Sequence, residues 1–167
     1  MWAGKRIAAV AAAIMALVAA PNAASAWAPA SQAQVTPGVQ TDTAGGQCTA
    51  NFVFTSGSDV FIGQAAHCAG TGAATDTDGC DAQSLPLGTP VTVSGATRPG
   101  TLAYSSWLTM QQAGETDPDA CAYNDFALIR LDPADHAKVN PSIPTYGGPT
   151  GVGGPTAAGD RVYSYGN

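Results

Sequence analysis

Short runs in which apolar and polar residues alternate fill the chain between residues 48 and 131. Alternation with a period of two is typical of β-strands that have one buried face, and clusters of Gly, Ser, Asp and Pro separate the runs. The runs joined by residues 56–59 and by residues 96–100 predict two β-hairpins. The predicted strands comprise residues 48–55, 60–63, 89–95, 101–104, 107–112 and 124–131.

Short strands at hairpin spacing, with no helix longer than a turn or two, predict an all-β barrel or sandwich. We favour a barrel because a closed sheet leaves no exposed edge strand. The 20 glycines, 12 prolines and only 11% charged residues fit a compact, turn-rich secreted β protein. A net charge of −6, with no cluster of Lys and Arg after residue 6, argues against nucleic-acid binding.

Residues 1–26 follow the pattern of a secretory signal peptide. Lys5 and Arg6 precede an uninterrupted apolar run over residues 7–20, and Ala24-Ser25-Ala26 is a small-residue cleavage site. The run is too short to span a bilayer comfortably, so we expect a secreted, extracellular protein with no membrane association after cleavage. An uncleaved membrane anchor is the alternative.

Two further stretches lack alternation. Residues 27–46 are rich in Ala, Gln, Thr, Pro and Gly, and we expect them to form a mobile N-terminal extension or short pro-segment. Residues 141–158 resemble a linker because Pro, Gly and Thr dominate them. Residues 159–166 then predict one further strand.

The candidate chemistry begins with His67, which follows two alanines at the end of a predicted strand. Asp125 lies at the start of the strongly apolar strand 124–131. A carboxylate that accepts a hydrogen bond from one imidazole nitrogen fixes the tautomer and leaves the other nitrogen free to take a proton from a nucleophile. We therefore predict that His67 is a general base and Asp125 its orienting acid. The alternatives are a structural histidine beside a disulfide and an aspartate that caps a turn.

Metal binding is a weaker interpretation. Asp76, Asp78 and Asp81 lack the spacing of an EF-hand loop, and we interpret them as a solvated acidic loop rather than a calcium site. The pair His67 and Cys68 lacks the paired ligand spacing that zinc requires. His136, among Asp and Lys residues, is predicted to be a solvated surface residue. The four cysteines predict two disulfides in an exported protein, with three possible connectivities.

Two motifs resemble those of the trypsin/chymotrypsin-like serine proteases, in particular the secreted bacterial branch. They are Ala65-Ala66-His67-Cys68 and Asn124-Asp125-Phe126-Ala127-Leu128-Ile129-Arg130-Leu131, in the same order along the chain. The resemblance covers residues 47–167 and implies a double barrel. Its first barrel, six-stranded and antiparallel, would occupy residues 47–157, and its second would be truncated after one strand at residues 158–167. The resemblance also implies disulfides Cys48–Cys68 and Cys80–Cys121, and neither a metal nor a cofactor.

The activity implied by this resemblance is that of a secreted serine endopeptidase, which hydrolyses peptide bonds through a Ser-His-Asp triad. Its substrates would be proteins or peptides, and the full-length enzyme would be a monomer. This chain supplies only His67 and Asp125, because Ser142 and Ser164 lack the flanking glycines of the family's nucleophile motif. The alternative is a non-catalytic, protease-like β-barrel that acts as a secreted binding module.

Overall fold

The structure is a computed structural model that describes residues 27–44, 46–73, 75–143, 146–151 and 153–165. The predicted signal peptide lies outside the described residues. The described chain is mostly β, and none of its helices is long and apolar enough to cross a membrane. Its strands are β1 (Gln40–Thr43), β2 (Gly46–Thr49), β3 (Val53–Ser56), β4 (Asp59–Gln64), β5 (Pro90–Val93), β6 (Gly100–Ser105) and β7 (Ala127–Arg130). Its helices are α1 (Ser106–Ala113) and α2 (Pro118–Tyr123), with 3₁₀ helices η1 (Ala66–Ala69) and η2 (Pro133–Lys138).

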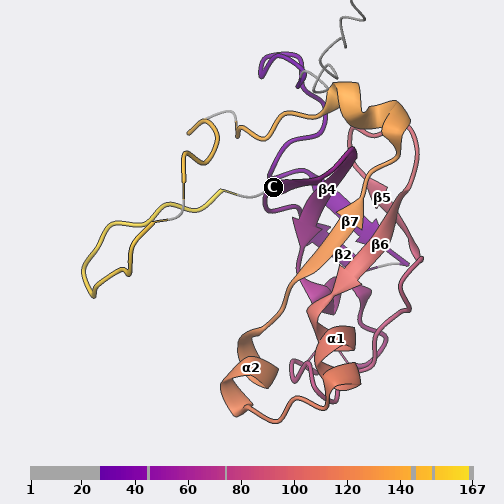
Figure 1. Cartoon of the computed structure of the whole chain (residues 1–167), viewed down its shortest axis with the longest axis vertical. Helices are drawn as coiled ribbons and strands as arrows, with labels where there is room; N and C mark the ends of the chain where they lie inside the picture. Colours follow the sequence, from indigo (N-terminus) through magenta and orange to yellow (C-terminus); the bar gives the residue numbers. More distant parts are fainter. Residues whose placement is uncertain (1–26, 45, 74, 144–145, 152, 166–167) are drawn as a thin grey trace, which may run out of the picture.

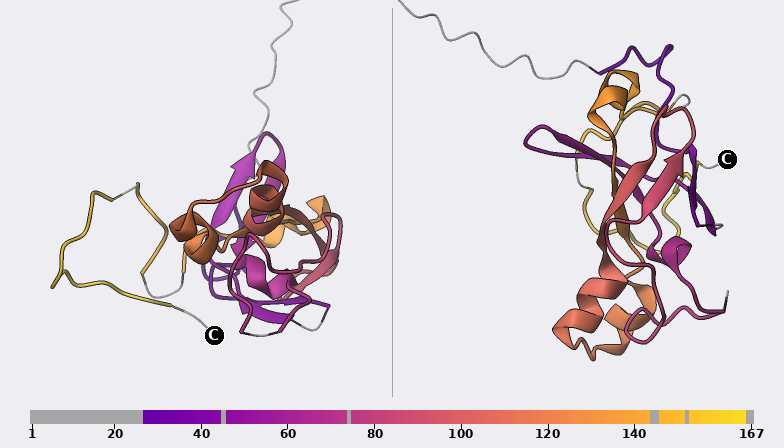
Figure 2. Two further views of the ribbon diagram at one scale, coloured as in Figure 1. Left: turned by 90° about the horizontal axis from the view of Figure 1, so that it is seen from below. Right: turned by 90° about the vertical axis from the view of Figure 1, so that its right-hand side faces the viewer.

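The seven strands form one antiparallel sheet in the order β2-β1-β5-β6-β7-β4-β3. Helices α1 and α2 lie together at one end of the strands and η2 lies at the opposite end (Figures 1 and 2). Both predicted hairpins are confirmed, as β3 pairs with β4 and β5 pairs with β6.

The core lies on one face of the central strands. Ile62 on β4 is directly opposite Ile129 on β7, which is directly opposite Leu102 on β6, and all three side chains are fully buried. Burial of an aliphatic side chain of this size stabilises a fold by about 1.5–3 kcal/mol. This row of three residues therefore fixes the register between β4, which precedes His67 in the chain, and β7, which follows Asp125.

Strands β2 and β3, at the two ends of the strand order, are consecutive in the chain. In the short segment between them, the N–H of Ala50 donates to the carbonyl of Val39 at 2.8 Å, next to β1. The N–H of Asn51 donates to Gly63 of β4 at 2.8 Å, and Gly63 donates back to Phe52 at 2.9 Å. The segment thus changes partners within three residues, from the β1 side to the β4 side.

The prediction that residues 27–46 form a mobile extension is wrong for the described part of that segment. Val35 is fully buried, and its N–H donates to the carbonyl of Lys138 at 3.2 Å. Strand β1 belongs to the sheet, so the domain begins before residue 47. The alternation was hidden because the core-facing residues of β1 are Thr41 and Thr43, both buried, and the hydroxyl of Thr43 accepts a hydrogen bond from Gln64 at 3.2 Å.

The predicted strand at residues 107–112 is also wrong, because these residues belong to helix α1. Trp107 and Met110 are buried and lie three residues apart, which places them on one face of a helix. Gly114 ends the helix in the left-handed conformation with φ 67°, which glycine adopts without steric cost. The spacing of three, rather than two, was the available signal.

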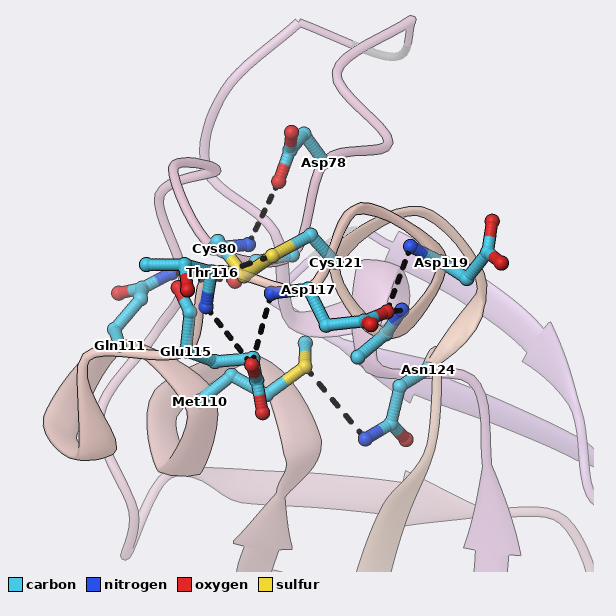
Figure 3. Close-up of a disulfide and its surroundings, with 12 residues drawn as sticks. Asp78, Cys80, Met110, Gln111, Glu115, Thr116, Asp117, Asp119, Cys121 and Asn124 are labelled. Carbon is cyan, nitrogen blue, oxygen red and sulfur yellow. Dashed lines mark hydrogen bonds between the residues drawn. A yellow bond between two sulfur atoms is a disulfide. The ribbon is translucent and has the colours of Figure 1, made fainter.

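Helix α2 is held by its cap and by a disulfide (Figure 3). Cys121 of α2 is bonded to Cys80, with their Cα atoms 5.1 Å apart. The carboxylate of Asp117 accepts hydrogen bonds from the N–H groups of Asp119 at 3.0 Å and Ala120 at 2.9 Å. These bonds satisfy donors that the first turn of a helix would otherwise leave free. The cap fixes where α2 begins and hence where the chain leaves it for Asp125.

We expect Asp117→Ala to lower the free energy of unfolding by about 1 kcal/mol, the usual cost of losing an N-cap. Urea unfolding followed by circular dichroism measures this change. Asp119→Ala is the matched control, because Asp119 is exposed and lies outside the cap position. Equal destabilisation by the two substitutions would contradict the capping role.

A buried carboxylate within η2, that of Asp135, connects this helix to the turn that contains Thr97 and Arg98. The Asp135 side chain is fully buried and lies 2.8 Å from the Lys138 ammonium group. It also accepts hydrogen bonds from the hydroxyl of Thr97 at 2.7 Å and from the N–H groups of Thr97 and Arg98 at 3.0 Å. The prediction that His136 is a solvated surface residue is wrong, because the residue is half-buried and its Nε2 atom is shielded from solvent.

The C-terminal segment leaves the sheet as an extended loop (Figure 1). The predicted strand at residues 159–166 is absent from the described part, 159–165, in which every residue is exposed and none pairs with a strand. The ring of Tyr165 lies against Gly38, a glycine with φ 94°. A side chain at position 38 would occupy the space of that ring, so the contact depends on glycine.

Candidate active site

His67 projects from η1, directly after the end of β4. Its neighbours Ala66, Cys68 and Ala69 are buried, whereas His67 itself is exposed. Cys68 is bonded to Cys48 of β2, with their Cα atoms 6.0 Å apart. The small buried residues and the disulfide thus anchor a tight turn whose one large polar side chain faces outward.

Asp125 lies in the short segment between α2 and β7, 58 residues after His67. Its Oδ2 atom is 2.6 Å from Nδ1 of His67. Its Oδ1 atom accepts a second hydrogen bond, from the backbone N–H of His67, at 2.9 Å. The two oxygens of one carboxylate therefore hold both the ring and the backbone of a single residue. The structure brings together the two residues that the sequence paired.

The carboxylate determines the tautomer of the imidazole. An ionised carboxylate only accepts hydrogen bonds, so Nδ1 of His67 is the nitrogen that carries the proton. In the neutral ring Nε2 then has a free lone pair. The His67 side chain is 55% exposed and the Asp125 side chain 34% exposed, so Nε2 remains accessible to a reacting group. This is the arrangement that general-base chemistry requires.

The contacts that define the position of His67 are the two hydrogen bonds to Asp125. Ser142 and Ser164, the serines weighed from the sequence, lie in the C-terminal region, where the N–H of Ser142 donates to Asn140 at 2.8 Å and Ser164 is exposed. Neither of these two serines is brought to the His67–Asp125 pair by a hydrogen bond between the described residues.

A cleft of about 520 Å³ opens beside the imidazole. This volume is in the range of sites that hold small ligands or substrate side chains. The sequence motifs do not indicate most of the residues that line this cleft, because these residues come from separate segments of the chain and form no local pattern typical of a site. The cleft is lined by Ala44, Gly46, Gln47, His67, Cys68, Gly70, Gly72, Ala73, Asp76, Ala82, Gln83 and Trp107.

Both disulfides implied by the resemblance are present, Cys48–Cys68 and Cys80–Cys121. Two groupings of potential metal ligands occur among the described residues, namely His67 with Cys48 and Cys68, and Asp78 with the other two cysteines. In each grouping the cysteine sulfurs are bonded to each other, whereas metal binding by cysteine requires the thiolate. Asp76 and Asp81 belong to neither grouping.

Comparison with known proteins gives no further information on the His67–Asp125 pair. No family model matches the chain, and neither the curated proteins nor the solved structures yield a match.

Proposed function

We propose that this chain supplies the general base and the orienting acid of a secreted serine endopeptidase of the trypsin-like family. The observation that carries the proposal is the pair of hydrogen bonds that the Asp125 carboxylate accepts from His67, at 2.6 Å from the ring and 2.9 Å from the backbone. Because one carboxylate engages both groups, the ring is fixed in tautomer and in direction, as a proton shuttle requires.

The reaction proceeds in two stages. The Nε2 atom of His67 takes the proton from a serine hydroxyl as its oxygen attacks the peptide carbonyl carbon, and the C–N bond breaks when the imidazolium returns that proton to the departing amine. Water then repeats the sequence on the acyl-enzyme, releasing the acid and restoring the serine. Asp125 keeps its charge throughout and stabilises the imidazolium. The proposal requires a nucleophilic serine and an oxyanion hole in addition to His67 and Asp125.

The proposal includes a closed first barrel. The two end strands of the sheet, β2 and β3, are joined by residues 50–52, which bond first toward β1 and then toward β4. A strand order whose two end strands are consecutive in the chain supports closure, since closure leaves no free edge. A chymotrypsin-like double barrel, with a second barrel that carries the nucleophile, follows from the same resemblance.

The test treats the full-length natural protein with a serine-directed phosphonate probe. We expect the probe to label the wild-type protein covalently. His67→Ala should reduce the labelling rate at least about 100-fold, because general-base catalysis contributes factors of this order or more. His136→Ala is the matched control and should be labelled at the wild-type rate. Equal labelling of the His67→Ala variant and the wild type would refute the proposal.

A non-catalytic binding module is the second candidate. It is favoured by large exposed aromatic side chains, namely Phe52, Phe54 and Tyr123, of which Tyr123 is 80% exposed and lies two residues before Asp125. Exposed aromatic residues are common in interaction surfaces. A wild-type protein that the phosphonate never labels, although it is folded, would support this candidate over the enzyme.

A further inference from the structure

The backbone around Asp125 lies outside the regular pairing of the sheet. Helix α2 ends at Tyr123, and β7 begins only at Ala127. The segment between them must nevertheless direct the Asp125 carboxylate at two donors of His67 at once. Since active-site groups must be held within fractions of an ångström of their working geometry, some other contact has to fix this segment.

Ser106, the first residue of α1, makes that contact. Its hydroxyl donates to the carbonyl of Asn124 at 2.7 Å and accepts from the N–H of Phe126 at 2.9 Å. Its own N–H donates to the carbonyl of Phe126 at 2.8 Å. The side chain is fully buried. Both residues that flank Asp125 are therefore hydrogen-bonded to one serine.

The place of Ser106 in the chain explains why a hydroxyl is needed. Ser105 is paired with Ala127, so Ser106 is the next residue opposite Phe126 in the antiparallel ladder. A strand residue at this position would use its carbonyl to accept the N–H of Phe126. At Ser106 the chain turns into α1, where backbone carbonyls accept bonds from the helix. The hydroxyl takes over the role of that carbonyl and extends the ladder by one step, as far as Asp125.

We propose that Ser106 is a positioning residue, whose buried hydroxyl fixes the backbone on both sides of Asp125 and so aims its carboxylate at His67. This inference rests on the proposed function for its catalytic meaning. It concerns a residue that contacts the neighbours of Asp125 and not His67 itself. It can be tested without any turnover of substrate.

Ser105 provides a matched control within the same turn. It is also buried, yet its hydroxyl has no hydrogen-bond partner among the described residues. Ser105→Ala therefore removes the same atom from an adjacent position without touching the Asp125 segment. A role of Ser106 in packing alone would give the two alanine variants similar behaviour.

The measurement is the low-field proton resonance of the His67 Nδ1–H group in the 15N-labelled protein. We expect this resonance in the wild type, in Ser105→Ala and in Ser106→Thr, which retains the hydroxyl. In Ser106→Ala it should vanish or exchange with water about 10-fold faster, as expected for the loss of a supporting hydrogen bond. The backbone amide spectrum reports whether each variant is folded. If Ser106→Ala does not fold, Ser106→Cys, whose thiol is a weak donor, replaces it with the same expected loss.

An unchanged resonance in folded Ser106→Ala would overturn the proposal, as would an equal loss in Ser105→Ala. Absence of the resonance from the wild type would overturn it too, because there would be no His67–Asp125 bond to position. Selective loss in Ser106→Ala, in a protein that the phosphonate does not label, would support the role of Ser106 and refute only the endopeptidase. The two hypotheses therefore fail in different experiments.

Discussion

Under the proposed function, replacing Asp125 with Asn is expected to lower the turnover number about 10⁴-fold, the cost of this change in the Ser-His-Asp template. The amide keeps the size of the carboxylate but brings an NH₂ donor and no charge. With that donor facing Nδ1, the ring protonates at Nε2 instead, and Nε2 can no longer accept the serine proton. The developing imidazolium also loses the negative charge 2.6 Å away.

Hydrolysis of a peptide substrate under saturating conditions measures this effect, since turnover then reports the chemical stage. Asp119→Asn is the control, because it removes an equal charge from an exposed position on the neighbouring helix α2. We expect the control to retain wild-type turnover. A fall of less than about 10-fold in Asp125→Asn would mean that Asp125 does not orient the base, given the far larger effect in the template.

The largest expected effect on stability is that of Asp135→Ala, about 1.5–3 kcal/mol, the usual contribution of hydrogen bonds to a charged group. The substitution leaves the Lys138 ammonium without its partner at 2.8 Å. It also removes the acceptor of the N–H groups of Thr97 and Arg98. Urea unfolding at neutral pH measures the loss. Asp81→Ala, at an exposed position, should change stability by less than about 0.5 kcal/mol.

The same carboxylate makes stability depend on pH. Burial alone would raise the pKa of Asp135, but hydrogen bonds from Lys138, from the Thr97 hydroxyl and from the N–H groups of Thr97 and Arg98 outweigh it and lower the pKa below its ordinary value. The unfolded chain therefore binds the proton more readily than the folded one. The contribution of Asp135 is fully present above its unfolded pKa of about 3.9 and is lost as the pH falls below that value.

Unfolding curves of the wild type and of Asp135→Ala at pH 7 and at pH 3 separate the contribution of the Asp135 carboxylate from general effects of acid on stability. The difference in stability between the wild type and Asp135→Ala should shrink at the lower pH, because the unfolded wild-type chain takes up a proton at Asp135 that the folded protein binds less readily. A difference that stays constant between the two pH values would show that the ionised form of Asp135 is not what stabilises η2.

Much of the sheet could be predicted from the sequence because local patterns encode it. Strands β4 and β6 coincide closely with predicted runs, since Ile62 and Leu102 alternate with outward residues and turn residues mark their ends. Strand β1 was missed because threonines occupy its buried positions. The helix α1 was missed because only two buried apolar residues, Trp107 and Met110, mark its inward face, and a single spacing of three is a weak signal of a helix.

The residues of the candidate site likewise include some that the sequence predicts and others that it does not. His67 and Asp125 each lie in a recognisable local motif, so the sequence could pair them although they are 58 residues apart. Ser106 could not be found, because its role depends on a ladder position that exists only once β6 and β7 are paired. The walls of the cleft likewise come from separate loops, whose approach is decided by the packing of the whole domain.

The Cys48–Cys68 disulfide has a consequence for folding as well as for the site. Cys48 lies opposite Thr41 in the pairing of β1 with β2, and its partner adjoins His67. A slip of β2 by one residue would move Cys48 by about 3.3 Å and turn its side chain to the other face. The present Cα separation of 6.0 Å is within the range that a disulfide spans, and a slipped strand would lose it. The disulfide therefore favours this alignment of β1 and β2 and at the same time anchors the turn that carries His67.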